Sequence, residues 1–328
     1  MPIVSYRASA FPPSAGASLL GHHDLWVPLN DLVHAAITVG KPGVAHLFTH
    51  GWNSISDIII RTHTVYAYLQ YVAGRYGKSS LYESLDPTEK AAASYFMGMI
   101  SAKVVFDRLL KTPWLFHVSM LKPLGHSFNL KGKSEPDLVG KNALGEWVVA
   151  EAKGRSNGFN QPAMRAAKEQ TRQLRTINGA APALRVAIQA SFEPYLRFDL
   201  CDPEDAAERA IDIETDLDTV MHRYYSGIID ATEGAEVALI QGRQFLVRKI
   251  EEVGVTVGLD TGVRYLRLFG LSGRIPALLH PPDAKMYDGD DPQNFRVYGD
   301  GVAIALDRRW SDNVMALSPF ERREGFGN

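Results

Sequence analysis

The stretch that decides the fold is DLVGKNALGEWVVAEAK, residues 137–153. Two short apolar runs, 137–140 and 146–153, flank a loop rich in Gly and Asn, a pattern typical of a β-hairpin. Apolar residues occupy both faces of the second run up to Ala150, as in a central strand that is covered on both sides. We therefore predict a hairpin inside a sheet, whose second strand ends in charged residues.

The charged residues of this hairpin are expected to meet at one edge of the sheet. Side chains alternate along a strand, so Glu151 and Lys153 share one face and Ala152 lies on the other. Antiparallel pairing brings Asp137 level with the end of the second strand. Two carboxylates supply the oxygen ligands that Mg²⁺ prefers. A nearby lysine can position the water that such a metal activates, which suits phosphodiester hydrolysis.

Pro136-Asp137 followed by Glu151-Ala152-Lys153 resembles the signature of the PD-(D/E)xK nuclease superfamily, which includes restriction endonucleases and recombination exonucleases. The resemblance implies that Asp137 and Glu151 ligate Mg²⁺, with help from the Ala152 carbonyl, and that Mn²⁺ substitutes. It also implies that Lys153 serves the attacking water. The structural alternative is an exposed hairpin whose Glu and Lys only end a strand.

The neighbouring elements follow the order of that superfamily's core. A helix should start at the Asp86 cap, with Pro87 in its first turn and Glu89 completing a capping box, and run to Lys111. Strands are predicted at 114–120 and 184–191 and a helix at 162–177, besides the hairpin. We therefore predict an α/β fold with a restriction-endonuclease-like core: helix, three-strand meander, helix and strand, in a mixed sheet flanked by helices.

The chain divides into three predicted parts. Residues 1–85 form an N-terminal, mostly helical extension, irregular over 1–30 and helical over 54–76. Residues 86–200 form the core. Residues 201–328 begin with an acidic stretch, 201–218, which carries eight acidic side chains and one basic. A helix at 219–229 and a β-rich region follow, with strands predicted at 245–250, 255–259, 265–269 and 302–306 and an exposed loop at 275–294.

The helix predicted at 162–177 carries the candidates for substrate binding. Residues 153–175 hold six basic side chains and one acidic. The nucleic-acid-binding candidates are Arg155, Arg165, Lys168, Arg172 and Arg175. A solvated face is the alternative for this basic stripe.

Gln170 is a further catalytic candidate, predicted in the middle of that helix's apolar face. Relatives that resemble recombination exonucleases place a glutamine there, usually with an aromatic residue four positions later, where this chain has Leu174. A satisfied buried amide is the alternative for Gln170. Glu83 and Glu89 are candidates for an acidic residue from the first helix, although capping alone explains Glu89.

The expected function is a Mg²⁺-dependent nuclease that acts on DNA, with a role in defence or repair. A non-catalytic nucleic-acid-binding or interaction module is the alternative. An α/β-hydrolase, suggested by His50-Gly51-Trp52 and residues 125–129, is remote, because Asn129 stands where a nucleophile elbow requires Gly. The ten histidines show no zinc spacing.

Composition places the chain among soluble globular proteins, with 45% hydrophobic and 22% charged residues and a net charge of −2. Cys201 has no partner for an intramolecular disulfide, which favours a reducing compartment. No apolar run reaches the roughly 20 residues of a membrane span, and the first residues do not resemble a signal peptide. We expect a cytoplasmic protein without a membrane partner, whose flanking regions select the substrate or a protein partner; the oligomeric state stays open.

Overall fold

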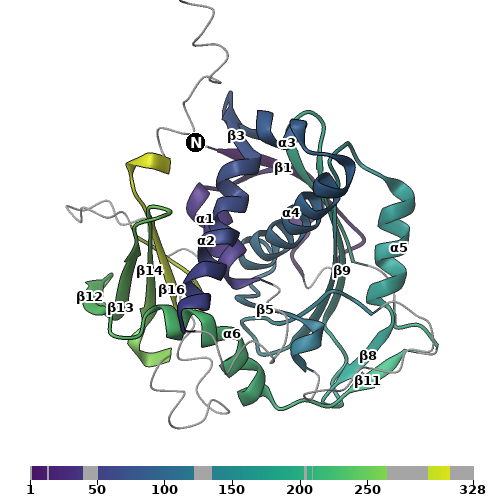
Figure 1. Cartoon of the computed structure of the whole chain (residues 1–328). Helices are drawn as coiled ribbons and strands as arrows, with labels where there is room; N and C mark the ends of the chain where they lie inside the picture. The colour runs from purple at the N-terminus through teal and green to yellow at the C-terminus, as the bar shows by residue number, and fades with distance from the viewer. Residues whose placement is uncertain are drawn as a thin grey trace, which may run out of the picture.

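A computed structural model describes residues 2–12, 15–39, 51–121, 135–202, 205–208, 210–263 and 295–310. A nine-stranded sheet and a five-stranded sheet lie on opposite sides of a layer of helices, and α5 covers the outer face of the larger sheet (Figure 1).

The larger sheet contains the predicted hairpin in its interior. Its strands are β1 (Ile3–Ser9), β2 (Gly21–Trp26), β3 (Leu69–Val72), β4 (Arg75–Lys78), β5 (Trp114–His117), β6 (Leu138–Lys141), β7 (Trp147–Gly154), β9 (Leu184–Phe192) and β10 (Leu196–Cys201). They lie in the order β3-β4-β1-β10-β9-β7-β6-β5, and β2 pairs with β1. β5, β6 and β7 form an antiparallel meander, and β9 runs parallel to β7. The sheet is therefore mixed.

The helices begin where the local sequence provides caps. They are α1 (Leu29–Thr38), α2 (Gly51–Tyr68), α3 (Ser80–Ser84), α4 (Pro87–Arg108), α5 (Gln161–Thr171) and α6 (Leu217–Ala231). The capping box of Asp86 and Glu89 forms as predicted at the start of α4. Asn160 caps α5 by accepting from the Ala163 N–H at 2.8 Å. α4 and α5 pack on opposite faces of the larger sheet (Figure 1).

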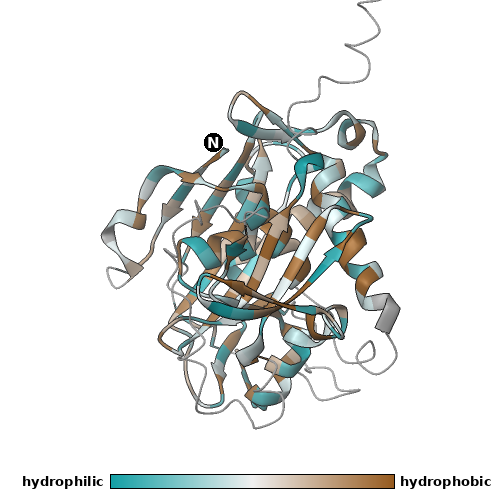
Figure 2. Cartoon of the chain, turned by 90° about the vertical axis from the view of Figure 1, so that its left-hand side faces the viewer, coloured by the Kyte–Doolittle hydropathy of each residue, from teal (hydrophilic) through white to brown (hydrophobic). Residues whose placement is uncertain are grey.

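The second sheet is formed by the C-terminal part of the chain. Its strands are β12 (Glu236–Ile240), β13 (Arg243–Ile250), β14 (Val255–Asp260), β15 (Arg296–Val297) and β16 (Val302–Leu306), in the order β12-β13-β14-β16-β15. Figure 2 looks onto this sheet and shows hydrophobic residues along its strands. α1 packs against β16 and α6 against β14, so one face of the sheet covers the helical layer.

One hydrophobic core joins the three parts into which the sequence divides the chain. It includes Val33 of α1, Val105 of α4, Val149 of β7, Tyr224 of α6 and Ile304 of β16, each at most 1% exposed. α1 and α4 thus lie in the layer between the two sheets, whereas α5 lies on the outer face of the larger sheet.

The α/β class and the mixed sheet flanked by helices are confirmed, but several local predictions are wrong. The helix predicted at 54–76 ends at Tyr68, where β3 and β4 follow, and the strand predicted at 114–120 ends at His117. Residues 1–30 are not irregular: they include β1 and β2, and β1 pairs in parallel with β10 over Ser5–Ser9. The N-terminal part, with β1 to β4, therefore continues the sheet of the predicted core.

The helix predicted at 162–177 is too long. It ends at Thr171, and Leu174–Ile177 forms a short strand, β8, that pairs in parallel with β11 (Ile211–Ile213) of the acidic stretch. The strand predicted at 265–269 and the loop predicted at 275–294 lie outside the described residues. Among the described helices, none combines the length and hydropathy that crossing a membrane requires.

Candidate functional site

The β6–β7 hairpin places the two candidate carboxylates opposite each other. Leu138 pairs with Ala150, so Asp137 lies directly across from Glu151. The Asp137 N–H donates to Glu151 Oε2 at 2.8 Å, and the Ala152 N–H donates to Asp137 Oδ2 at 3.2 Å. Each carboxylate is thus held by the backbone of the other strand, which fixes both at the same level of the sheet.

Lys153 completes the cluster of charged side chains. Burial has the largest effect on the pKa of the Glu151 carboxyl in this cluster. The Lys153 ammonium donates to Glu151 Oε1, and its side chain is 29% exposed, whereas Glu151 is fully buried. Burial raises the pKa of Glu151 to about 8; the Asp137 carboxylate raises it too, and Lys153 lowers it. The site is therefore short of positive charge when both carboxylates are ionised.

A divalent cation fits this donor set chemically. Asp137 and Glu151 offer carboxylate oxygens, and Ala152, between Glu151 and Lys153, offers a carbonyl oxygen, which are the ligand types of Mg²⁺. Within the described ranges, no group of three or more His, Cys, Asp or Glu side chains is placed to hold a metal. The expected set has two carboxylates, so the remaining ligands would come from the backbone, water and substrate.

A close contact between β7 and α4, the helix that carries Tyr95, lies on the face of the sheet opposite to Glu151 and Lys153. A Cβ atom on Gly154 would lie 1.6 Å from the Ser94 carbonyl oxygen, and one on Gly98 would lie 2.6 Å from the Gly154 nitrogen. Only glycine at both positions lets α4 approach β7 so closely. Burial raises the pKa of Tyr95, and the Asp137 and Glu151 charges raise it further. Tyr95 is 46% exposed and was not singled out by the sequence analysis, although a glycine inside a helix was a usable signal.

The glutamine that lies beside Lys153 in the sheet is Gln189 of β9. Lys153 and Gln189 are paired residues of parallel strands, so both side chains lie on the α5 face. Gln189 is fully buried: its Oε1 accepts from the Asn160 N–H at 2.6 Å and its Nε2 donates to the Asn160 carbonyl at 3.0 Å. Gln189 thereby anchors the start of α5 next to the candidate site.

Gln170 does not occupy the centre of an apolar face. The buried residues of α5 are Met164, Ala167 and Thr171, and Gln170 is half-buried in the last turn. Its catalytic role stays a prediction. Of the two acidic candidates, Glu89 accepts from the Asp86 N–H in the capping box, and Glu83 of α3 pairs with Lys78 at 2.7 Å.

The basic residues expected on one helix are divided between three settings. Arg165 and Lys168 lie on α5, exposed and half-buried. Arg172 is the C-cap residue and pairs with Glu169 at 3.2 Å, and Arg175 lies on β8 and pairs with Asp212 at 3.1 Å. Arg155 follows β7, and its buried Nε has no hydrogen-bond partner among the described residues. The prediction that Arg165, Lys168, Arg172 and Arg175 form a stripe on one helix is wrong, because α5 ends at Thr171.

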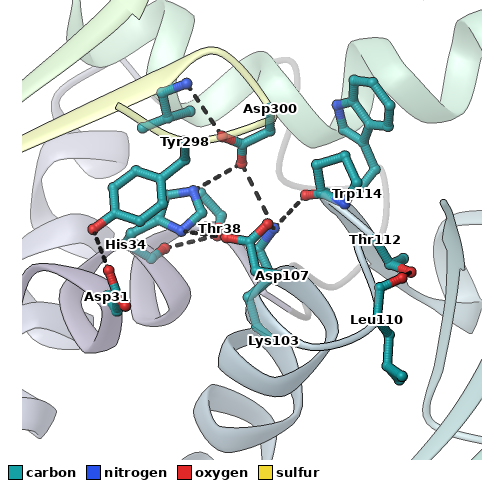
Figure 3. Close-up of polar contacts among 12 residues, drawn as sticks. Asp31, His34, Thr38, Lys103, Asp107, Leu110, Thr112, Trp114, Tyr298 and Asp300 are labelled. Atoms are coloured by element: carbon teal, nitrogen blue, oxygen red, sulfur yellow. Dashed lines mark hydrogen bonds and ion pairs between the residues drawn. The ribbon is translucent and has the colours of Figure 1, made fainter. Parts of the chain in front are cut away.

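A second charged cluster, distant in the sequence, joins the helical layer to the C-terminal sheet (Figure 3). His34 Nε2 lies 2.9 Å from Asp300 Oδ2, Tyr224 OH donates to the same oxygen at 2.6 Å, and Lys103 Nζ lies 3.7 Å from it. Burial raises the pKa of Asp300, but His34 and Lys103 outweigh it and hold that pKa below its usual range. Lys103 and Asp300 are fully buried, so this cluster offers no surface to a substrate and acts as an internal clamp.

The segments behind the other enzyme hypotheses are largely undescribed. His50 and residues 125–129 lie outside the described ranges, so the α/β-hydrolase alternative is not tested. Comparison of the chain with protein-family models, with curated proteins and with solved structures found no match.

Proposed function

We propose that the chain is a metal-dependent nuclease that hydrolyses phosphodiester bonds of DNA at Asp137, Glu151 and Lys153. The observation that carries the proposal is the fully buried Glu151 carboxylate, held against Asp137 with one lysine beside it. Burying a carboxylate costs free energy unless a cation compensates it. A buried carboxylate with a strongly shifted pKa is typical of a functional site, so we expect Glu151 to take part in catalysis.

The element order supports the same proposal. α4, the β5–β6–β7 meander, α5 and β9 follow one another as in a restriction-endonuclease-like core, apart from the short β8 before β9. The reacting groups lie in the last residues of β7, beyond its pairing with β6 and still paired with β9.

Each residue has a distinct chemical task. Asp137 and Glu151 would hold Mg²⁺ with the Ala152 carbonyl. When bound, Mg²⁺ supplies positive charge to the phosphate and lowers the pKa of its water. Lys153, partly exposed beside Glu151, holds a proton close to the water and neutralises charge on a phosphate oxygen.

The experiment uses isosteric variants of the full chain. Asp137→Asn and Glu151→Gln should each reduce Mg²⁺-dependent cleavage at least a hundredfold, and Lys153→Met should do so while Mn²⁺ binding, followed by calorimetry, persists. Glu146→Gln, an exposed residue just before the same strand, is the control and should cut at the parental rate. Circular, linear and single-stranded DNA and RNA are the substrates. Cleavage by Glu151→Gln at the parental rate would refute the site.

Substrate contacts are tested by salt dependence. If Arg165 and Lys168 contact phosphates, the double alanine variant should flatten the plot of log affinity against log salt by about two units of slope. An unchanged slope would return these residues to the solvated surface. Binding without cleavage by the parental protein, with Mg²⁺ or Mn²⁺ present, would favour the non-catalytic module instead.

We place this activity in the cytoplasm, where the buried free thiol of Cys201 stays reduced.

A further inference from the structure

A pocket of about 490 Å³ opens beyond the loop that follows Lys153. It is lined by residues of β1, β2, β4, β10 and the β9–β10 turn: Ser5, Tyr6, His22, His23, Asp24, Arg75, Glu193, Tyr195, Leu196 and Arg197. Its volume is within the range of small-ligand sites. None of these residues belongs to the candidate catalytic cluster.

The pocket lies on the same sheet as the candidate site, at a distance set by strand spacing. β7, which carries Glu151, is followed across the sheet by β9, β10 and β1. Three spacings of about 4.8 Å separate β7 from β1 by roughly 14 Å. Glu151 is level with Ser9 of β1 through Ala187 and Cys201, and Ser5 in the pocket lies four residues, about 13 Å, further along that strand. The pocket is therefore about 19 Å from Glu151, and at about 3.4 Å for each stacked nucleotide a strand held at Glu151 reaches it after about six nucleotides.

The loop between the two sites is fixed by buried polar residues. Gln189 bonds both backbone groups of Asn160, and the Asn157 carbonyl accepts from the Phe192 N–H at 3.1 Å. A Cβ atom on Gly158 would lie 2.7 Å from Glu193 Oε2, so the loop presses against the rim of the pocket. The path from Lys153 to the pocket therefore crosses an ordered polar loop.

The pocket presents a guanidinium that is only loosely paired. Arg75 NH1 donates to Ser5 Oγ at 2.7 Å, while its NH2 lies 3.8 Å from Asp24 Oδ2, and its side chain is 36% exposed. An exposed ion pair of this length contributes little stability, so a phosphate can replace the carboxylate. Arg197, held by Asp199 through two bonds of 3.0 and 3.1 Å, adds a second, fixed guanidinium. Guanidinium groups match phosphate geometry.

The same pocket carries acceptors and rings that suit the rest of a nucleotide. Asp24 and Glu193 present carboxylate oxygens that accept from amino groups of bases or from sugar hydroxyls. Tyr195 packs near Gly77, 3.9 Å from the position of a Cβ atom there, and the His23 and Tyr6 rings lie 5.3 Å apart. Aromatic rings provide stacking surfaces for bases of any sequence.

From these contacts we propose that the pocket binds a nucleotide of the substrate strand, about six nucleotides from the scissile phosphate. Arg75 holds its phosphate, and Tyr195 and the two carboxylates face its base and sugar. This inference rests on the proposed nuclease function and adds to it a preference for strands long enough to reach both sites.

The first test measures nucleotide binding without cleavage. The full-length protein is titrated with dAMP and dCMP, without metal, by calorimetry. Binding is expected, and Arg75→Ala should weaken it at least tenfold. Arg309→Ala is the matched control, because Arg309 is also an exposed arginine paired with an aspartate, Asp307 at 2.8 Å, and lies outside the pocket. Equal affinity for Arg75→Ala and the parent, or no binding at all, would overturn the pocket assignment.

The second test separates this inference from the proposed function. The ratio of kcat/KM for a twelve-nucleotide strand over a four-nucleotide strand should fall about tenfold in Arg75→Ala and stay at the parental value in Arg309→Ala. An unchanged ratio in Arg75→Ala would overturn the link between pocket and site. Mononucleotide binding in a protein that cleaves no nucleic acid would refute the nuclease function and leave the pocket as a nucleotide site.

Discussion

Glu151→Gln should stabilise the metal-free protein at alkaline pH while removing its activity. The pKa of Glu151 lies at about 8 in the fold against 4.5 as its ordinary value. At about 1.36 kcal/mol for each pKa unit, the ionised side chain costs the folded state up to about 5 kcal/mol. Glutamine has nearly the same shape and no charge, so the variant does not carry this cost.

The sign and the pH window follow from the direction of the shift. Below pH 4.5 the carboxyl is protonated in both the folded and unfolded states, and the variant should match the parent. Between pH 4.5 and about 8 the unfolded state releases its proton first, so the parent loses stability as the pH rises. Above pH 8 the difference is constant, and in a chain of this length it corresponds to about 7 °C in Tm.

The assay is thermal unfolding of both proteins with EDTA at pH 5, 7 and 9, with Glu146→Gln as the exposed control. Mg²⁺ at a hundred times its Kd should raise the free energy of unfolding of the parent at pH 9 by about 2.7 kcal/mol. It should leave that of Glu151→Gln unchanged. If the Tm difference between the parent and Glu151→Gln is the same at pH 5, 7 and 9, the pKa of Glu151 is not raised in the folded protein.

Three other substitutions test separate features. Lys103→Met leaves Asp300 without its buried cation and should cost about 3–5 kcal/mol in urea unfolding; a loss below 1 kcal/mol would contradict the clamp. Gly154→Ala drives a methyl group into the Ser94 carbonyl and should cost about 3 kcal/mol, measured as a lower midpoint, whereas parental stability would show that α4 can move away. Gln170→Leu tests the role of the Gln170 amide. A tenfold lower turnover at unchanged Tm, equivalent to about 1.4 kcal/mol in the activation barrier, would assign Gln170 to the catalytic site. Parental turnover would exclude it from that site.

The parts of the fold that were predicted correctly depend on local signals. The capping box at Asp86 and the hairpin at residues 137–153 are encoded within a few residues, and both formed. The pairing of Asp137 with Glu151 followed from strand periodicity and register alone. The end of α5 was missed because the apolar spacing of Leu174 and Ile177 fits a helix as well as a short strand, and β11 decides between them.

The remaining features depend on contacts between distant segments. β1 was missed because the Pro- and Ser-rich residues after it obscure a strand whose partner, β10, lies far along the chain. The clamp of His34, Lys103 and Asp300 draws on three segments, and none of the three shows a pattern in its own neighbourhood. α4 approaches β7 closely only because two glycines, Gly98 and Gly154, leave room for the contact.

The parallel pairing of β1 with β10 has a consequence for synthesis on the ribosome. Ser5 pairs with Arg197, so β1 emerges long before its partner has been made. At about 5–20 residues per second, the edge of β1 that faces β10 stays unpaired for roughly 10–40 s, although β2 can already pair with the other edge. His34 waits longer still, for Asp300, 266 residues further on. While β1 waits for β10, a chaperone or a second nascent chain can bind its unpaired edge. Slower translation before residue 200 lengthens this time and should therefore increase aggregation.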